Sequence, residues 1–168
     1  DDRIGCVVVI EALKQLRSSP HNIYAVFAVQ EEVGLRGAKV ASFGIEPDVG
    51  IAFDVTTTGD TPKSKTMDVS LGKGVAIKVK DSSLICHPGL REYLVELAEE
   101  KGIPYQMEVL EAGGTDSAAI QMTKAGIPAG VISIPSRYVH SPGEMVDLGD
   151  VKACVDLCVA ACESALEF

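Results

Sequence analysis

Residues 23–38 read Ile-Tyr-Ala-Val-Phe-Ala-Val-Gln-Glu-Glu-Val-Gly-Leu-Arg-Gly-Ala, an apolar run that ends in two adjacent carboxylates. The run from Ile23 to Val29 predicts a buried strand, because short continuous apolar stretches are typical of strands covered on both faces. Glu31 and Glu32 would then lie beyond a strand's carboxyl end, where open α/β sheets place ligands. Two unpaired carboxylates repel each other, so the pattern favours a site that holds a cation or a shared proton. The plain alternative is a strand that ends in solvent with two exposed acids.

Helical and extended segments alternate along the whole sequence. Helices are expected at 4–17, 37–43, 88–101, 116–124 and 148–166, and strands at 23–29, 49–53, 75–79, 105–110 and 129–134. The helix at 88–101 opens with Pro88 and stops at Gly102, as helix end signals require. A polar stretch from Thr56 to Ser70 predicts a long loop. This order predicts one α/β domain over residues 1–168, in three α/β/α layers around a mostly parallel sheet.

Other acids and an imidazole lie next to predicted elements. Asp54 directly follows the strand at 49–53, His140 lies in the loop after the strand at 129–134, and Asp1-Asp2 precedes the first helix. Their oxygen and nitrogen atoms suit zinc, cobalt or manganese. Taken singly, each has an ordinary structural explanation as a helix cap, a turn residue or a surface residue. Together at one edge of one sheet, they favour a metal site.

Composition narrows the class of protein. The chain has 168 residues, 46% of them hydrophobic, which suits one domain with a substantial core. The formal net charge of −9 argues against nucleic acid and against anionic membrane surfaces as partners. No apolar run reaches the roughly 18 residues that span a bilayer, and the amino end does not read as a signal peptide.

Five cysteines occur, without the paired spacing of a zinc ribbon or a disulfide framework. Cys154, Cys158 and Cys162 recur every four residues, which places the three thiols along one helix face. Core packing is the expected role, since a free cysteine behaves as a small hydrophobe, and metal or redox chemistry is the alternative. Reduced thiols suggest a cytoplasmic protein.

Five motifs together resemble a known family. They are Asp1-Asp2-Arg3-Ile4-Gly5-Cys6, Gln30-Glu31-Glu32-Val33-Gly34-Leu35-Arg36-Gly37-Ala38, Phe53-Asp54, Gly113-Gly114-Thr115-Asp116 and Arg137-Tyr138-Val139-His140-Ser141-Pro142. In this order they resemble the dinuclear metal aminopeptidases of the tetrahedral, glutamyl-aminopeptidase-like type, whose members are often also described as endoglucanases or cellulases. Family chains are longer: a segment with a His-x-Asp metal motif and an inserted β-rich dimerisation domain precede the Asp-Asp-Arg motif. The sequence therefore resembles the C-terminal catalytic portion, without an initiator Met.

The resemblance implies a role for each candidate site residue. Asp1 would bridge two metal ions, Glu32 and His140 would complete one metal site, and Asp54 would serve the other with a histidine outside this sequence. Glu31 would be the general base. The substrate-binding residues would be Gly114, Thr115, Asp116 and Arg137. On physical grounds alone, the Gly113–Asp116 motif is a tight turn followed by a helix N-cap.

The implied cofactors are two divalent metal ions in the full-length protein, zinc or cobalt with manganese as a third candidate, and one ion or none in these 168 residues. The implied activity is removal of residues from the amino end of peptides, in a protein that forms a homo-oligomer at full length. A second hypothesis is a folded, non-catalytic fragment or binding module. An endoglucanase is less favoured, because a glycosidase needs two metal-free carboxylates beside a sugar.

Overall fold

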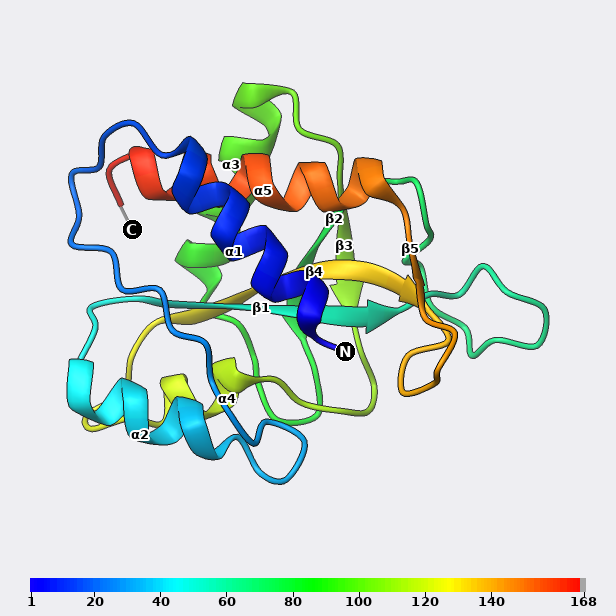
Figure 1. Cartoon of the computed structure of the whole chain (residues 1–168), viewed down its shortest axis with the longest axis horizontal. Coiled ribbons are helices and arrows are strands. Elements are labelled where there is room, and N and C mark those ends of the chain that lie inside the picture. The colour runs from blue at the N-terminus through cyan, green and yellow to red at the C-terminus, as the bar shows by residue number, and fades with distance from the viewer. Residues whose placement is uncertain (167–168) are drawn as a thin grey trace.

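A five-stranded mixed sheet forms the centre of the protein in the computed structural model, which describes residues 1–166 (Figure 1). The elements in chain order are α1 (Arg3–Gln15), α2 (Arg36–Ile45), β1 (Gly50–Thr57), β2 (Val75–Lys80), α3 (Pro88–Lys101), β3 (Tyr105–Val109), α4 (Asp116–Gln121), β4 (Ala129–Arg137), β5 (Met145–Val146) and α5 (Leu148–Glu163). Among the described residues, no helix is both long and apolar enough to cross a membrane.

The strands lie in the order β1-β4-β2-β3, and the short β5 pairs with β4. β1 runs parallel to β4, and β2 runs parallel to β3. The two parallel pairs meet at one antiparallel junction, where Ala76 of β2 lies opposite Ser133 of β4. The predicted α/β class is therefore confirmed, with a sheet of mixed rather than uniform strand direction.

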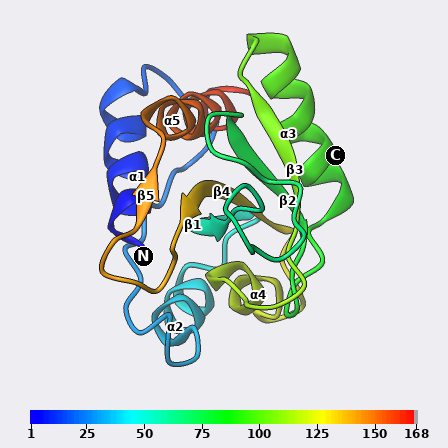
Figure 2. The same ribbon diagram turned by 90° about the vertical axis from the view of Figure 1, so that its right-hand side faces the viewer.

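Helices cover both faces of the sheet, as the three-layer prediction requires. α1, α3 and α5 lie on one face, and α2 and α4 lie on the other (Figure 2). Successive side chains of β4 point to opposite faces of the sheet, so both layers pack against it. Ile132 and Ile134 join the core under α3 and α5, whereas Val131 joins a smaller cluster with Ala52 of β1. Cys154 and Cys158 of α5 are buried free thiols within the larger core, and Cys162 is a partly buried free thiol packed against it, which confirms core packing as their role.

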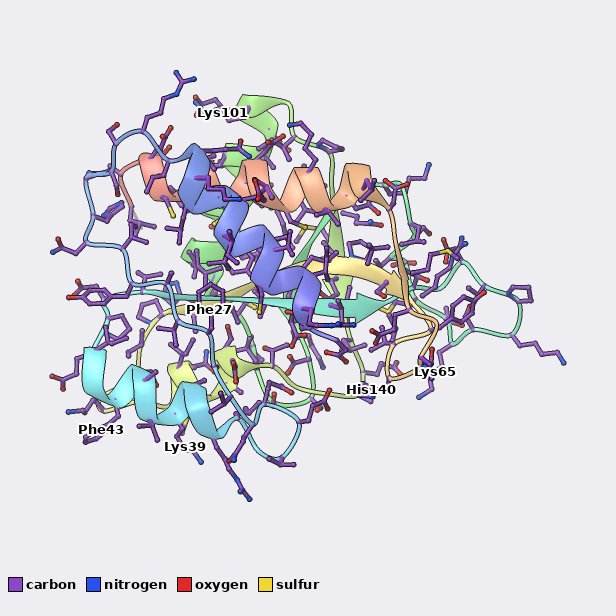
Figure 3. The ribbon with its side chains drawn as sticks, viewed as in Figure 1. Phe27, Lys39, Phe43, Lys65, Lys101 and His140 are labelled. Atoms are coloured by element: carbon purple, nitrogen blue, oxygen red, sulfur yellow. The ribbon has the colours of Figure 1, made fainter. Side chains whose placement is uncertain are left out.

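One predicted strand is wrong. Residues 23–29 form no strand, and their apolar side chains are exposed, with Tyr24 at 67% and Phe27 at 50%. Figure 3 shows Phe27 at the surface between α1 and α2. An extended segment becomes a strand only where a neighbouring strand pairs with its backbone, and no strand of residues 1–166 does so here. The N–H group of Gly37 does donate to the carbonyl oxygen of Val29, at 2.9 Å.

Several predicted boundaries also differ, including those of α1, which ends at Gln15, and β4, which continues to Arg137. β1 continues to Thr57, so Asp54 lies inside the strand rather than just after it. α4 ends at Gln121 because a turn follows, in which Lys124 and Gly126 take positive φ angles. α5 ends at Glu163, where the backbone of Ser164 becomes extended.

Candidate metal centre

Asp1, Glu32 and His140 bring their ligand atoms together, all within 4.8 Å of one another. Nε2 of His140 lies 2.9 Å from Oδ2 of Asp1 and 3.2 Å from Oε1 of Glu32. Each group comes from a different segment: the residues before α1, the turn before α2, and the loop after β4. Figure 1 shows the N-terminus on the side of the sheet where β1 and β4 end, and Figure 3 places His140 there. The His140 side chain is 67% exposed, so the cluster is open to solvent.

The backbone turns sharply at the two adjacent glutamates. Gln30 has a φ angle of 61°, and the carbonyl oxygen of Glu31 accepts from the N–H groups of Gly34 at 3.0 Å and Leu35 at 2.9 Å. Side chains of consecutive residues point to opposite faces only in a strand. The turn removes that restriction, so Glu31 and Glu32 can both face this edge of the molecule.

The loop that carries His140 is held in an uncommon conformation. Tyr138 and His140 have φ angles of 61° and 62°, and for residues other than glycine such values cost about 1–3 kcal/mol each. At the base of the loop, the Arg137 guanidinium donates to both carboxylate oxygens of Asp60, at 3.0 and 2.8 Å. The same contact, with its donated hydrogen bonds, holds the pKa of Asp60 far below its usual range. Non-glycine residues with positive φ angles are common at functional sites. They keep this conformation only where contacts with the surrounding structure hold it.

Further carboxylates crowd the same edge. Burial, and then the charges of Asp2 and Glu31, raise the pKa of Asp54 to about 8. Burial raises the pKa of Asp2 to about 6. Burial, followed by the nearby charges of Asp116 and Glu32, also raises the pKa of Glu31. A bound cation would offset the repulsion among these carboxylates. Carboxylate oxygens with one imidazole suit zinc, cobalt or manganese. The residues present therefore fit a divalent metal.

Asp54 is not part of the three-group cluster. Its position in β1 pairs with Ser133 of β4, and the residue is half-buried. Asp54 therefore lies nearer the sheet than Asp1, Glu32 and His140, although Asp2 and Glu31 are close enough to influence its ionisation.

The residues expected to bind substrate divide into two groups. Thr115 Oγ1 and Asp116 Oδ1 are buried atoms that have no hydrogen-bond partner in the described part of the chain. Gly114 packs so closely that a Cβ atom there would lie 2.6 Å from Ser83 Oγ. The guanidinium of Arg137, by contrast, is already engaged by Asp60.

Two further acids of this region have structural roles: Asp2 takes the helix-cap role named above as an alternative, and Glu144 was not among the sequence candidates. Asp2 caps α1, because its Oδ1 accepts from the N–H group of Gly5 at 2.9 Å. The sequence did hold a signal for that role, since Asp is a favoured N-cap residue. Glu144 contacts the backbone nitrogens of Asp1 and His140. Nothing in Pro142-Gly143-Glu144 indicates this contact beyond the presence of a turn.

Comparison with known proteins places these features in a family context. A family model described as M42 glutamyl aminopeptidase matches residues 1–157. A putative aminopeptidase of Acetivibrio thermocellus is 57% identical over 161 residues, which are 96% of this chain and 49% of the relative. A lysyl aminopeptidase of Pyrococcus furiosus is 42% identical, over 97% of this chain and 46% of its own. The chain thus spans about half the length of the curated relatives it matches.

Solved structures agree with the sequence relatives. An aminopeptidase from the archaeon Desulfurococcus kamchatkensis matches with a TM-score of 0.95 and 47% identity, over 99% of this chain and 48% of the other. The TET1 peptidase of Pyrococcus horikoshii is described as able to assemble into a tetrahedron or a large octahedral shell. It matches with a TM-score of 0.79 and 35% identity, over 98% of this chain and 48% of the other. A Thermotoga maritima protein described as an endoglucanase matches with a TM-score of 0.76 and 32% identity, over 97% of this chain and 47% of the other.

Proposed function

Because the chain belongs to the M42 glutamyl aminopeptidase family, we propose that its residues form the catalytic part of a metal-dependent aminopeptidase. The reaction is hydrolysis of the first peptide bond of a peptide, which releases the amino-terminal residue. The observation that carries this proposal is the convergence of Asp1, Glu32 and His140, three metal-ligand types from three separate segments.

Asp1, Glu32 and His140 would hold one divalent ion, zinc or cobalt. Three protein ligands with open access are the arrangement of catalytic zinc sites, in which the remaining position is free for water or substrate. A bound ion there supplies polarisation of the scissile carbonyl and a lowered pKa for bound water.

Glu31 is the proposed general base. It adjoins Glu32 in the same turn and lies close enough to His140 and Asp116 for their charges to influence its pKa. Its carboxylate would accept a proton from the attacking water and donate it to the leaving amine. A base with a raised pKa suits this task, because proton transfer is most effective when the pKa lies near the working pH.

A second ion would be held by Asp54, with Asp1 shared between the two ions. The described residues place no histidine beside Asp54 in a group of three ligands. We therefore expect the second site to need a ligand beyond those residues, and the 168-residue polypeptide to bind one ion with little turnover.

Gly114, Thr115 and Asp116 are proposed to form a wall of the substrate cleft. The unpartnered buried atoms of Thr115 and Asp116 support this, since buried polar atoms normally have partners. The proposed role of Arg137 is indirect, through the loop of His140, because Asp60 occupies its guanidinium. Assembly into a homo-oligomer is proposed from the shells described for the Pyrococcus horikoshii relative.

Two assays on one sample test the function against the endoglucanase description of the Thermotoga maritima relative. A protein that carries these residues at the relatives' full length is assayed with leucyl- and glutamyl-nitroanilide and with carboxymethyl-cellulose, before and after metal removal. We expect cobalt-dependent release of nitroaniline and no cleavage of cellulose. Cellulose cleavage that survives metal removal would overturn the proposal.

A further inference from the structure

The Glu144 carboxylate joins the backbones of two proposed metal ligands. Its Oε2 accepts from the terminal amino group of Asp1 at 2.7 Å, and its Oε1 accepts from the backbone N–H of His140 at 3.0 Å. We propose that Glu144 is a positioning residue, which fixes the distance between the side chains of Asp1 and His140. This inference rests on the proposed metal centre and adds a residue that contacts no metal itself.

Asp1 and His140 need such a link because no regular element joins them. Asp1 precedes α1, and His140 lies in the loop between β4 and β5. The imidazole of His140 is 67% exposed, so packing around the ring does little to hold it. A metal site tolerates only small changes in ligand spacing, and residues that hold ligands are therefore important for affinity.

The loop is fastened at its base by other contacts, but these do not reach Asp1. Ser136 pairs with Val146, and Arg137 pairs with Met145, in the short β4–β5 ladder. The Arg137–Asp60 ion pair holds the same base from the other side. Glu144 is the last residue of the loop, and its side chain turns back to contact the N–H of His140. Among the described hydrogen bonds, only those of Glu144 tie the backbone of the loop to the backbone of Asp1.

In the 168-residue chain the nitrogen of Asp1 is a terminal ammonium, so its charge strengthens the contact with the Glu144 carboxylate. A terminal amine and a peptide N–H group both have a hydrogen to donate, so Glu144 can accept from either. Both carboxylate oxygens are used, one for each backbone nitrogen. An amide at position 144 would keep one acceptor and would turn an NH2 group toward the other donor, so Glu144→Gln should lose part of the link.

Cobalt binding to the 168-residue chain tests the role. Wild type, Glu144→Gln and Glu144→Ala are titrated with Co²⁺ by calorimetry and by visible absorption, which reports coordination geometry. We expect Glu144→Ala to bind Co²⁺ about 10–100-fold more weakly, the usual effect of losing a group that orients a ligand, and with an altered absorption spectrum. Glu144→Gln should lie between wild type and Glu144→Ala.

Glu163→Gln is the matched control, because Oε1 of Glu163 also accepts from a distant backbone N–H, that of Arg17, at 2.8 Å. It should bind Co²⁺ as wild type does. In the metal-free proteins, the NMR signal of the His140 ring should shift in Glu144→Ala and stay unchanged in Glu163→Gln, with similar melting temperatures for both. Unchanged affinity, spectrum and ring signal in Glu144→Ala would overturn the positioning role and leave the metal centre standing. A wild-type chain that binds no Co²⁺ would overturn both.

Discussion

Nε2 of His140 lies 2.9 Å from Oδ2 of Asp1, although the two residues are far apart in the sequence and neither belongs to a helix or strand. The contact exists because α1 begins beside the edge of the sheet at which β4 ends (Figure 1). Oε1 of Glu32 lies 3.2 Å from the same nitrogen.

Removing one of the three converging groups should weaken metal binding. His140→Ala leaves two carboxylates, so its loss of Co²⁺ or Zn²⁺ affinity should exceed the roughly 10–100-fold effect of losing an outer partner. Calorimetric titration of the 168-residue chain measures it. His21→Ala is the control, since the His21 ring contacts the carbonyl oxygen of Ser164 at 2.8 Å and takes no part in the cluster. Equal losses in both variants would contradict the site.

Glu31 and Glu32 should differ in their effects despite being neighbours. In the protein at full family length, Glu31→Gln should retain metal and lose turnover by about 10²–10⁴-fold, the usual contribution of a general base. Glu32→Gln should lose metal, because its oxygen belongs to the cluster. Metal content and nitroanilide hydrolysis, measured on both variants, decide the matter. The opposite pattern would mean that the two roles are reversed.

The stability of the metal-free protein should fall as pH rises through the range set by Asp54. Burial, with Asp2 and Glu31 nearby, raises the pKa of this carboxyl to about 8 from its ordinary value of 3.8. The folded state thus binds the proton more tightly than the unfolded state, and the contribution is complete below about pH 4 and is lost as pH approaches 8.

Urea unfolding in the presence of a chelator, between pH 4.5 and 8.5, measures this dependence. Asp54→Asn should reduce the decline, since the amide does not ionise. Asp156→Asn is a control, because that carboxylate lies on the surface of α5 beside Lys152. A decline that is as steep in Asp54→Asn as in wild type would rule out Asp54 as its source.

The buried ion pair of Lys78 and Glu108 should be sensitive to loss of one partner. Both side chains are almost fully buried, Lys78 Nζ contacts Glu108 Oε1, and Thr56 also donates to this carboxylate at 2.7 Å. Lys78→Met leaves a buried carboxylate without its counter-charge and should lower the free energy of unfolding by about 3–5 kcal/mol.

Chemical denaturation of three variants tests the pair. Lys78→Met with Glu108→Leu should recover part of the loss, because Glu108 no longer contributes an unpaired charge. The recovery should be incomplete, because the buried Asp81 carboxylate, 3.8 Å from Lys78 Nζ, also loses its counter-charge. Lys152→Met removes a surface pair with Asp156 and should cost less than about 1 kcal/mol. A small effect of Lys78→Met alone would show that Glu108 takes up a proton or reaches solvent instead.

The isolated 168-residue chain should self-associate through its exposed apolar side chains. The exposed set spans α1, residues 23–29 and α2, and consists of Val7, Ile10, Leu13, Tyr24, Phe27, Val40 and Phe43. Figure 3 labels two of its members, Phe27 and Phe43, on one side of the molecule. β1 also ends the sheet with an unpaired edge. Apolar surface of this extent normally lies in an interface.

Light scattering as a function of concentration measures the association. Tyr24→Ser with Phe27→Ser should reduce it. Ile85→Ser is the control, because Ile85 is 71% exposed but lies next to β2 and α3, outside the exposed set. A monomer at all concentrations would contradict the expectation.

Local sequence patterns determined most of the elements. α3 begins at Pro88 and ends before Gly102, as its end signals predict, and the spacing of Cys154 and Cys158 correctly placed both thiols in the core. Such signals act within a few residues, through helix ends, periodic burial and turn chemistry, so they are readable without a fold.

Tertiary structure alone decided the rest. Residues 23–29 have the composition of a buried strand, yet pairing depends on a neighbour, and within residues 1–166 none is present, so the segment stays exposed. Three other features also depend on segments distant in sequence. They are the antiparallel pairing of β2 with β4, the ion pair of Arg137 with Asp60 and the contacts of Glu144. The sequence by itself determined which residues could serve a metal site. Only the packing of both helical layers against the sheet decided that Asp1, Glu32 and His140 meet, because distances between remote residues are set by how the layers stack.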